Sequence, residues 1–83
     1  EGLLELKKHD EENQTQYMET LRVYLEQHLS ATQAARELFI HRSTFLYRLD
    51  RIKEILQSEL DDPEEIFYLE LSFRLLEQEQ EKE

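Results

Sequence analysis

Apolar residues recur at helical spacing along most of the chain, and the alternation that is typical of a strand is absent. After Asn13, apolar side chains follow at offsets of three and four residues, which predicts an amphipathic helix over about residues 14–28. Asn13 with Gln16 three residues later has the form of a capping box, in which each side chain bonds to the other residue's backbone N–H. We therefore expect this pair to begin the helix.

A shorter helix and a longer one follow in close succession. Ser30 with Gln33 is a second capping-box candidate and predicts a short helix over about residues 31–38. We expect a break at residues 39–41 and a longer helix over about residues 42–57. The apolar stripe of the longer helix has spacings of four, three and four, and consists of Phe45, Leu49, Ile52 and Leu56.

The strongest start signal lies near the C-terminus. Asp62 is a good N-cap, and Pro63 suits the first helical position because its missing N–H would have no partner there. The two glutamates that follow favour the positive end of the helix. We predict a helix over about residues 63–80 and therefore an all-α, four-helix domain. The acidic residues 1–12 contain a leucine cluster that this pattern does not place.

Composition limits the size and class of the protein. A chain of 83 residues forms one domain, and one glycine and one proline leave little material for hairpin turns. With no cysteine, disulfide and thiol chemistry is excluded, and no apolar run reaches the length of a membrane helix. We expect a cytoplasmic protein without membrane association. The predicted layout is an acidic lead-in from a missing upstream region over 1–12, a domain over 13–80 and a frayed tail over 81–83.

The charge of the chain is unevenly distributed. The net charge of −10 argues, taken alone, against nucleic acid, because cations drive phosphate binding. Residues 31–57, however, carry five basic against three acidic side chains, a net charge of +2. The other 56 residues carry five basic and 17 acidic side chains, a net charge of −12. The acidity is therefore kept away from one cationic segment.

That cationic segment has the layout of a helix-turn-helix, with a short helix, a break of three residues and a longer helix. Ala35 suits a close helix crossing, and Leu38 and Ile40 can fill the gap between the two helices. Opposite the apolar stripe, the longer helix begins with polar and cationic residues, whereas Asp50 and Glu54 lie further along. Recognition helices read the major groove with their N-terminal residues. Only this end of the helix therefore suits DNA.

The stretch ATQAARELFIHRSTFLYRLDRIKEIL resembles the C-terminal helix-turn-helix of the PucR/CdaR family, the purine-catabolism and sugar-diacid regulators. It is more distantly similar to the DNA-binding end of the factor for inversion stimulation. The similarity extends over about residues 9–77, and Leu46 departs from it because the family is usually polar or variable there. The residues that carry the resemblance are Ala34, Ala35, Leu38, Ile40, His41, Arg42, Thr44, Tyr47, Arg48, Leu49 and Ile52.

The resemblance implies a bacterial transcription regulator whose sensory region is absent from this chain and responds to small metabolites. It also implies a dimer or a larger assembly. The expected partners are double-stranded DNA, a second copy of the chain and the upstream sensory domain. The candidate DNA-binding residues are Thr32, Gln33, Arg36, His41, Arg42, Ser43, Thr44, Tyr47, Arg48 and Arg51.

Several of these candidates have a second interpretation. His41 either contacts a phosphate or caps the following helix through a ring nitrogen, and the two interpretations are equally favoured. Tyr47 lies on the outward side of the helical wheel, which favours a DNA contact through its hydroxyl over a half-buried ring with a solvated tip. Arg48 and Arg51 either bind phosphates or pair within their own helix, and Arg36 either contacts the backbone or is solvated.

The helix over 63–80 carries two apolar rows, although one row is enough for the core of a monomer. Ile66, Leu69 and Phe73 begin one row. The other row consists of Phe67, Leu71 and Leu75. We expect this second row to form a dimer interface, and packing against the missing sensory domain is an alternative with the same chemistry.

Two functions are compatible with these patterns, and an enzyme is not. The sequence has no nucleophile–base pair and no glycine-rich phosphate loop, and its three scattered histidines have no metal spacing, so we expect no metal or cofactor. The favoured function is sequence-specific DNA binding, with the helix over 42–57 in the major groove. The alternative is a protein-interaction or dimerisation module with little DNA binding of its own.

Overall fold

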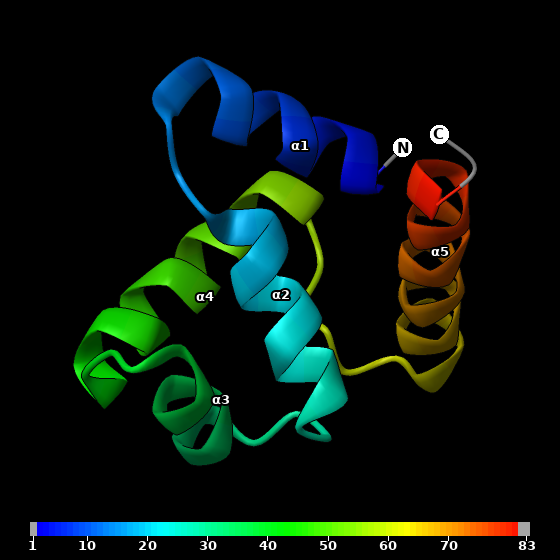
Figure 1. Ribbon diagram of the computed structural model, residues 1–83. Coiled ribbons are helices and arrows are strands. Elements are labelled where there is room, and N and C mark those ends of the chain that lie inside the picture. Colours follow the sequence, from blue (N-terminus) through cyan, green and yellow to red (C-terminus); the bar gives the residue numbers. More distant parts are fainter. Residues whose placement is uncertain (1, 82–83) are drawn as a thin grey trace.

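The computed structural model describes residues 2–81, and within this range every regular element is a helix (Figure 1). The all-α prediction is confirmed, but there are five helices instead of the four expected. The helices are α1 (Gly2–Asn13), α2 (Tyr17–Glu26), α3 (Ala31–Leu38), α4 (Arg42–Leu56) and α5 (Pro63–Glu81). None of the helices within residues 2–81 combines the length and the apolar character that crossing a bilayer requires.

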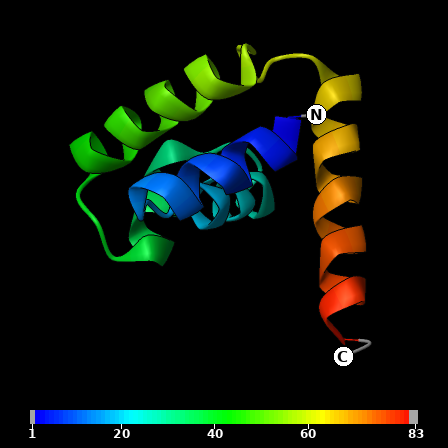
Figure 2. The same cartoon turned by 90° about the horizontal axis from the view of Figure 1, so that it is seen from above.

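The additional helix is α1, in the segment that the sequence pattern does not place. It crosses over α2 and α4, as Figures 1 and 2 show. Leu3 and Leu6 on its inner side are buried in the core, whereas Leu4 stays exposed. Because only two leucines of this helix are buried, its periodicity is too weak to identify it without its neighbours.

The predicted start of α2 is wrong in its detail. Asn13 and Gln16 do not form a capping box, because the side chain of Gln16 makes no capping bond and Asn13 donates to the carbonyl oxygen of His9. Instead, the Asp10 carboxylate of α1 accepts the backbone N–H groups of Tyr17 at 2.9 Å and Met18 at 2.8 Å. A side chain from another helix therefore satisfies the first donors of α2.

The helix-turn-helix has nearly the bounds that the sequence predicts. The Ser30 hydroxyl accepts the backbone N–H of Gln33 at 3.2 Å, which confirms one half of that capping box. Ala34 and Ala35 are buried where α3 meets α2 and α4. The predicted stripe of α4 faces the core, where Phe45, Leu49 and Ile52 are buried and Leu56 is partly buried.

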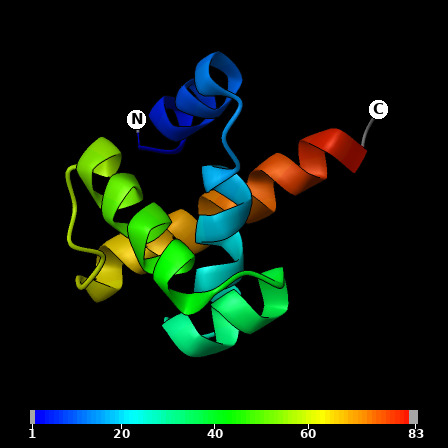
Figure 3. The ribbon, with the colours of Figure 1, turned by 90° about the vertical axis from the view of Figure 1, so that its left-hand side faces the viewer.

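The last helix begins as predicted, with Pro63 as its first residue. The Asp62 carboxylate accepts the backbone N–H of Glu64 at 3.1 Å, as an N-cap does. α5 packs against α2 and stands to one side of the other helices (Figure 1), and it passes behind α2 and α4 in Figure 3. Leu69 and Phe73 are its buried residues. The predicted frayed tail is 81–83, and its residues 82 and 83 lie outside the described range.

Candidate nucleic-acid interface

The turn between α3 and α4 is built from local geometry. Phe39 ends α3 in the left-handed conformation, with φ of 58°, and the backbone N–H of Ile40 then donates to the carbonyl oxygen of Ala35 at 3.1 Å. This is a common way to close a helix. Leu38 and Ile40, on either side of Phe39, both pack against the core. The chain is therefore held at both sides of the turn before it enters α4.

The start of α4 is capped by a histidine. The ring Nδ1 of His41 accepts the backbone N–H of Ser43 at 3.2 Å and lies 2.9 Å from its hydroxyl oxygen. This confirms the interpretation of His41 as a cap. A neutral imidazole that accepts at Nδ1 carries its hydrogen at Nε2. The exposed ring can therefore cap the helix and still donate a hydrogen bond outward.

The two helices are also joined by their polar side chains. Nε of Arg42, the first residue of α4, donates to the hydroxyl oxygen of Thr32 on α3 at 3.2 Å. This bond uses one of the five N–H donors of the guanidinium. Eight of the ten predicted contact residues are exposed and occupy α3, the turn and the first half of α4. They are Thr32, Gln33, Arg36, His41, Arg42, Ser43, Thr44 and Tyr47.

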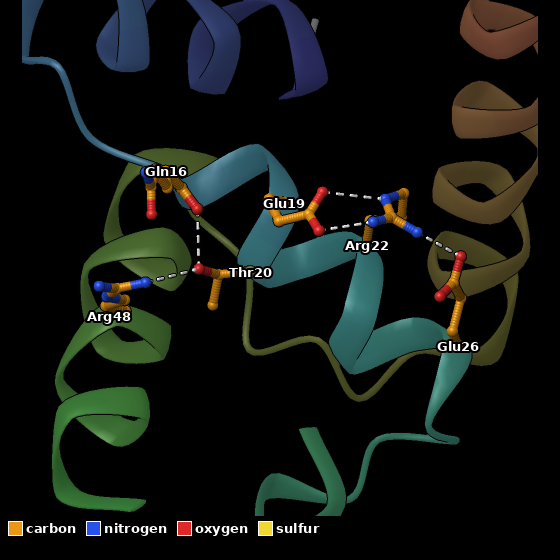
Figure 4. Close-up of polar contacts among 6 residues, drawn as sticks. All are labelled: Gln16, Glu19, Thr20, Arg22, Glu26 and Arg48. Carbon is orange, nitrogen blue, oxygen red and sulfur yellow. Dashed lines mark hydrogen bonds and ion pairs between the residues drawn. The ribbon is translucent and has the colours of Figure 1, made fainter. Parts of the chain in front are cut away.

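The remaining two predicted contacts, Arg48 and Arg51, are partly exposed and each has a partner within the chain. Nη1 of Arg48 lies 3.5 Å from the hydroxyl oxygen of Thr20 on α2, and that hydroxyl donates to the carbonyl oxygen of Gln16 at 2.7 Å (Figure 4). Arg51 pairs with the Glu54 carboxylate, whose negative charge raises the pKa of the guanidinium. To reach DNA, Arg51 would exchange an exposed ion pair, which is a weak interaction in water.

Arg22 of α2 is engaged on the other side of that helix from the Arg48–Thr20 contact (Figure 4). Its guanidinium lies 2.6 Å from a carboxylate oxygen of Glu19 and 2.7 Å from one of Glu26. The hydrogen bond to Glu19 is the main reason why the pKa of Arg22 is raised. Because two carboxylates offset its charge, Arg22 adds no cationic surface outside the helix-turn-helix.

Two residues that hold this arrangement together, Thr20 and Asp10, were given no structural role from the sequence, although both match the lead-in helix of the family. Thr20 is fully buried and joins α2 to Arg48 of α4. Its position three residues after Tyr17, on the inner face of α2, is the one signal that could have revealed it. Asp10 carries no such signal, because the Thr15 hydroxyl and the two backbone N–H groups that its carboxylate accepts lie five, seven and eight residues away.

The second apolar row of α5 is exposed, in contrast to the first row. The exposed fractions are 66% for Phe67, 44% for Leu71 and 55% for Leu75. The exposed Leu4 of α1 extends this surface, because it lines an apolar groove with Leu75 and Tyr68. Within residues 2–81, no group of three acidic, histidine or cysteine side chains is arranged to hold a metal ion.

The chain is similar to known transcription regulators. The profile of the PucR C-terminal helix-turn-helix domain family matches residues 17–75, from the start of α2 into α5. The chain is 41% identical over 58 residues to the purine catabolism regulatory protein of Bacillus subtilis. This alignment covers 70% of this chain and 11% of the relative. It is 40% identical over 57 residues to the proline-responsive transcriptional activator PutR of Bacillus subtilis. That alignment covers 69% of this chain and 14% of the relative.

The chain thus spans about a tenth of the length of these relatives. No solved structure matches it significantly. The matched range includes the helix-turn-helix and leaves out α1, and it confirms the resemblance seen in the sequence. Since this range is well over half of the chain, the protein belongs to the PucR C-terminal helix-turn-helix domain family, a family of transcription regulators with DNA-binding domains and not of enzymes.

Proposed function

We propose that this domain binds double-stranded DNA sequence-specifically, with the N-terminal half of α4 in the major groove and α3 across the backbone. The observation that carries the proposal is the clustering of eight exposed polar and cationic side chains over α3, the turn and the first half of α4. The surrounding chain is strongly acidic, so phosphate has one favourable face on which to dock.

The chemistry of this face suits both backbone and base contacts. The terminal N–H groups of Arg42 can form a bidentate pair with guanine or phosphate while Nε holds Thr32. With Nδ1 accepting from Ser43, Nε2 of His41 can donate to a phosphate oxygen at the start of α4, where the helix dipole also favours a negative charge. Thr44 and Tyr47, which follow on the same exposed side, can contact base edges or the backbone.

We further propose that the domain works in the cytoplasm of a bacterium as the C-terminal part of a homodimeric regulator with an upstream sensory region. The exposed row of Phe67, Leu71 and Leu75 is the surface we assign to the dimer. Two recognition helices would then read half-sites about one helical turn, roughly 34 Å, apart. The regulation of purine catabolism and the response to proline that the names of the two relatives state are properties of those proteins.

The test uses the tightest-binding duplex selected from a random pool. We expect Arg42→Ala to weaken binding by roughly 10- to 100-fold, and Thr44→Ala to weaken it less, with little change in melting temperature. Arg74→Ala removes an exposed charge from α5 and is the matched control, which we expect to bind as the wild type does. Unchanged binding by both Arg42→Ala and Thr44→Ala would contradict the assignment.

The second candidate function is that of a protein-interaction module with little DNA binding of its own. The exposed apolar row of α5 is the observation that favours it. The salt dependence of duplex binding separates the two functions, because a DNA reader loses affinity log-linearly as salt rises. A confirmed dimer that binds no duplex at low salt would support the second candidate.

A further inference from the structure

Phe39 has an unusual combination of backbone and side-chain environment. It lies in the turn between α3 and α4 with φ of 58°, in the left-handed region that residues with a Cβ avoid. Its side chain is 94% exposed, more than any other large apolar residue among those described. Both features are unfavourable for a phenylalanine, since a glycine or an asparagine would satisfy this backbone with no apolar surface in water.

Six non-glycine residues within 2–81 have a positive φ, and of these only Leu60 is buried, while the apolar Leu29 is 38% exposed. Leu60 has a left-handed backbone, with φ of 56°, but only 3% of it is exposed, so burial of the side chain offsets the backbone cost. No such compensation exists at Phe39. Its neighbours Leu38 and Ile40 supply the core contacts of the turn. The folded domain within residues 2–81 therefore gains nothing from the ring.

The surroundings of Phe39 indicate what its ring could contact. Arg36 lies three residues before it and Arg42 three residues after it, and both are exposed. The backbone N–H of Phe39 donates to the carbonyl oxygen of Arg36 at 3.2 Å, which fixes the turn against the end of α3. An apolar residue flanked in the sequence by two exposed cations matches a chain of alternating phosphates and apolar sugar faces. The sugar–phosphate backbone of DNA has this chemistry.

We propose that Phe39 packs on a deoxyribose at the rim of the major groove, between phosphates held by Arg36 and Arg42. The inference rests on the proposed DNA-binding function and adds an apolar contact to it. Because the turn directly precedes the N-terminus of α4, it lies over the backbone strand when that N-terminus enters the groove. The contact is with sugar and not with a base, so it strengthens binding to every duplex.

Substitutions at Phe39 can separate binding from folding. Asparagine tolerates the left-handed backbone, so Phe39→Asn should melt at the same temperature as the wild type or higher. We expect it to lower affinity roughly 5- to 20-fold, both for the selected duplex and for a duplex of random sequence, by removing the buried apolar contact. Phe39→Tyr keeps the ring and should bind within about two-fold of the wild type.

The salt dependence of DNA affinity distinguishes the loss of a charge from the loss of an apolar contact, because only the loss of a charge changes its slope. We expect the slope of log affinity against log salt to be the same for Phe39→Asn and the wild type. Arg42→Ala should reduce that slope by about one. Gln57→Asn is the matched control, because Gln57 is an exposed residue with φ of 54° at the far end of α4. This substitution replaces the side chain of a residue with the same left-handed backbone conformation as Phe39, and it should leave DNA affinity unchanged.

The outcomes separate this inference from the function on which it rests. Wild-type affinity in Phe39→Asn, together with weakened binding in Arg42→Ala, would overturn the sugar contact and leave the DNA-binding function intact. A loss of self-association in Phe39→Asn at unchanged DNA affinity would assign the ring to a protein interface and also overturn it. A wild-type chain that binds no duplex would overturn both proposals.

Discussion

Helices α4 and α5 both bury an apolar row on their inner sides, but their outer sides differ. Each buries one apolar row, which includes Phe45 and Leu49 in α4 and Leu69 and Phe73 in α5. The outer side of α4 begins with exposed polar and cationic residues from Arg42 onward. The outer side of α5 instead exposes a second apolar row within an acidic sequence.

The difference indicates that the two surfaces serve different partners. A cationic, hydrogen-bonding surface suits a polyanion, and an exposed apolar row suits another protein surface, where burial of apolar area drives association. The buried rows explain how the domain folds, whereas the exposed rows carry the information about what it binds. Substitutions confined to one surface show whether the two surfaces act separately.

The largest expected effect is on self-association through α5. Leu71→Asp combined with Leu75→Asp places two charges in the proposed dimer interface and should weaken the dimer by roughly 100-fold or more. Sedimentation equilibrium measures this change. Both residues are exposed in the single chain, so the folded monomer should remain. Glu70→Gln with Glu77→Gln, at exposed positions on the same helix, is the control, and a dimer unaffected by the aspartates would refute the interface.

An intermediate effect is expected where α1 supports the other helices. Asp10→Ala removes the carboxylate that accepts two backbone N–H groups at the start of α2. Loss of an N-cap destabilises by about 1–2 kcal/mol, which urea denaturation can measure. Glu11→Ala changes the exposed neighbouring carboxylate and should have little effect. Equal stabilities for these two variants would show that α1 does not cap α2 in solution.

The smallest expected effect concerns the acidic residues around the start of α5. Asp61→Asn with Glu64→Gln removes two exposed negative charges and should raise affinity for random duplex by roughly two- to four-fold, more than affinity for the selected duplex. Asp62 and Glu65 are kept because they bond to the backbone of α5 and to Ser58. A larger gain for the selected duplex would contradict the idea that the acidic surface discourages non-specific binding.

The sequence was most informative where structure is determined locally. The bounds of α3, the start of α5 and the caps at Ser30 and Asp62 follow from residues within three positions of one another, and the structure agrees with them. The histidine cap at the start of α4 was one of two interpretations that the sequence left open.

Contacts between distant residues were not predictable in this way. α1 depends on the burial of two leucines against other helices, and Asp10 caps a helix that begins seven residues later. The partner of Arg48 is the buried Thr20 on α2, and a helical wheel of α4 alone gives no information about a residue on another helix. The near-complete exposure of Phe39 likewise follows from how Leu38 and Ile40 pack on either side of it.

The most direct test of the DNA-binding surface is a residue-by-residue map of backbone amide chemical shifts as the selected duplex is added to the isotope-labelled chain. If α3 and the first half of α4 bind DNA, the largest shifts should fall on residues 32–47, which span α3, the turn and that half of α4. The outer row of α5 should change little at constant oligomeric state. Shifts confined to residues 67–75, with none over residues 41–47, would show that DNA does not bind to the helix-turn-helix.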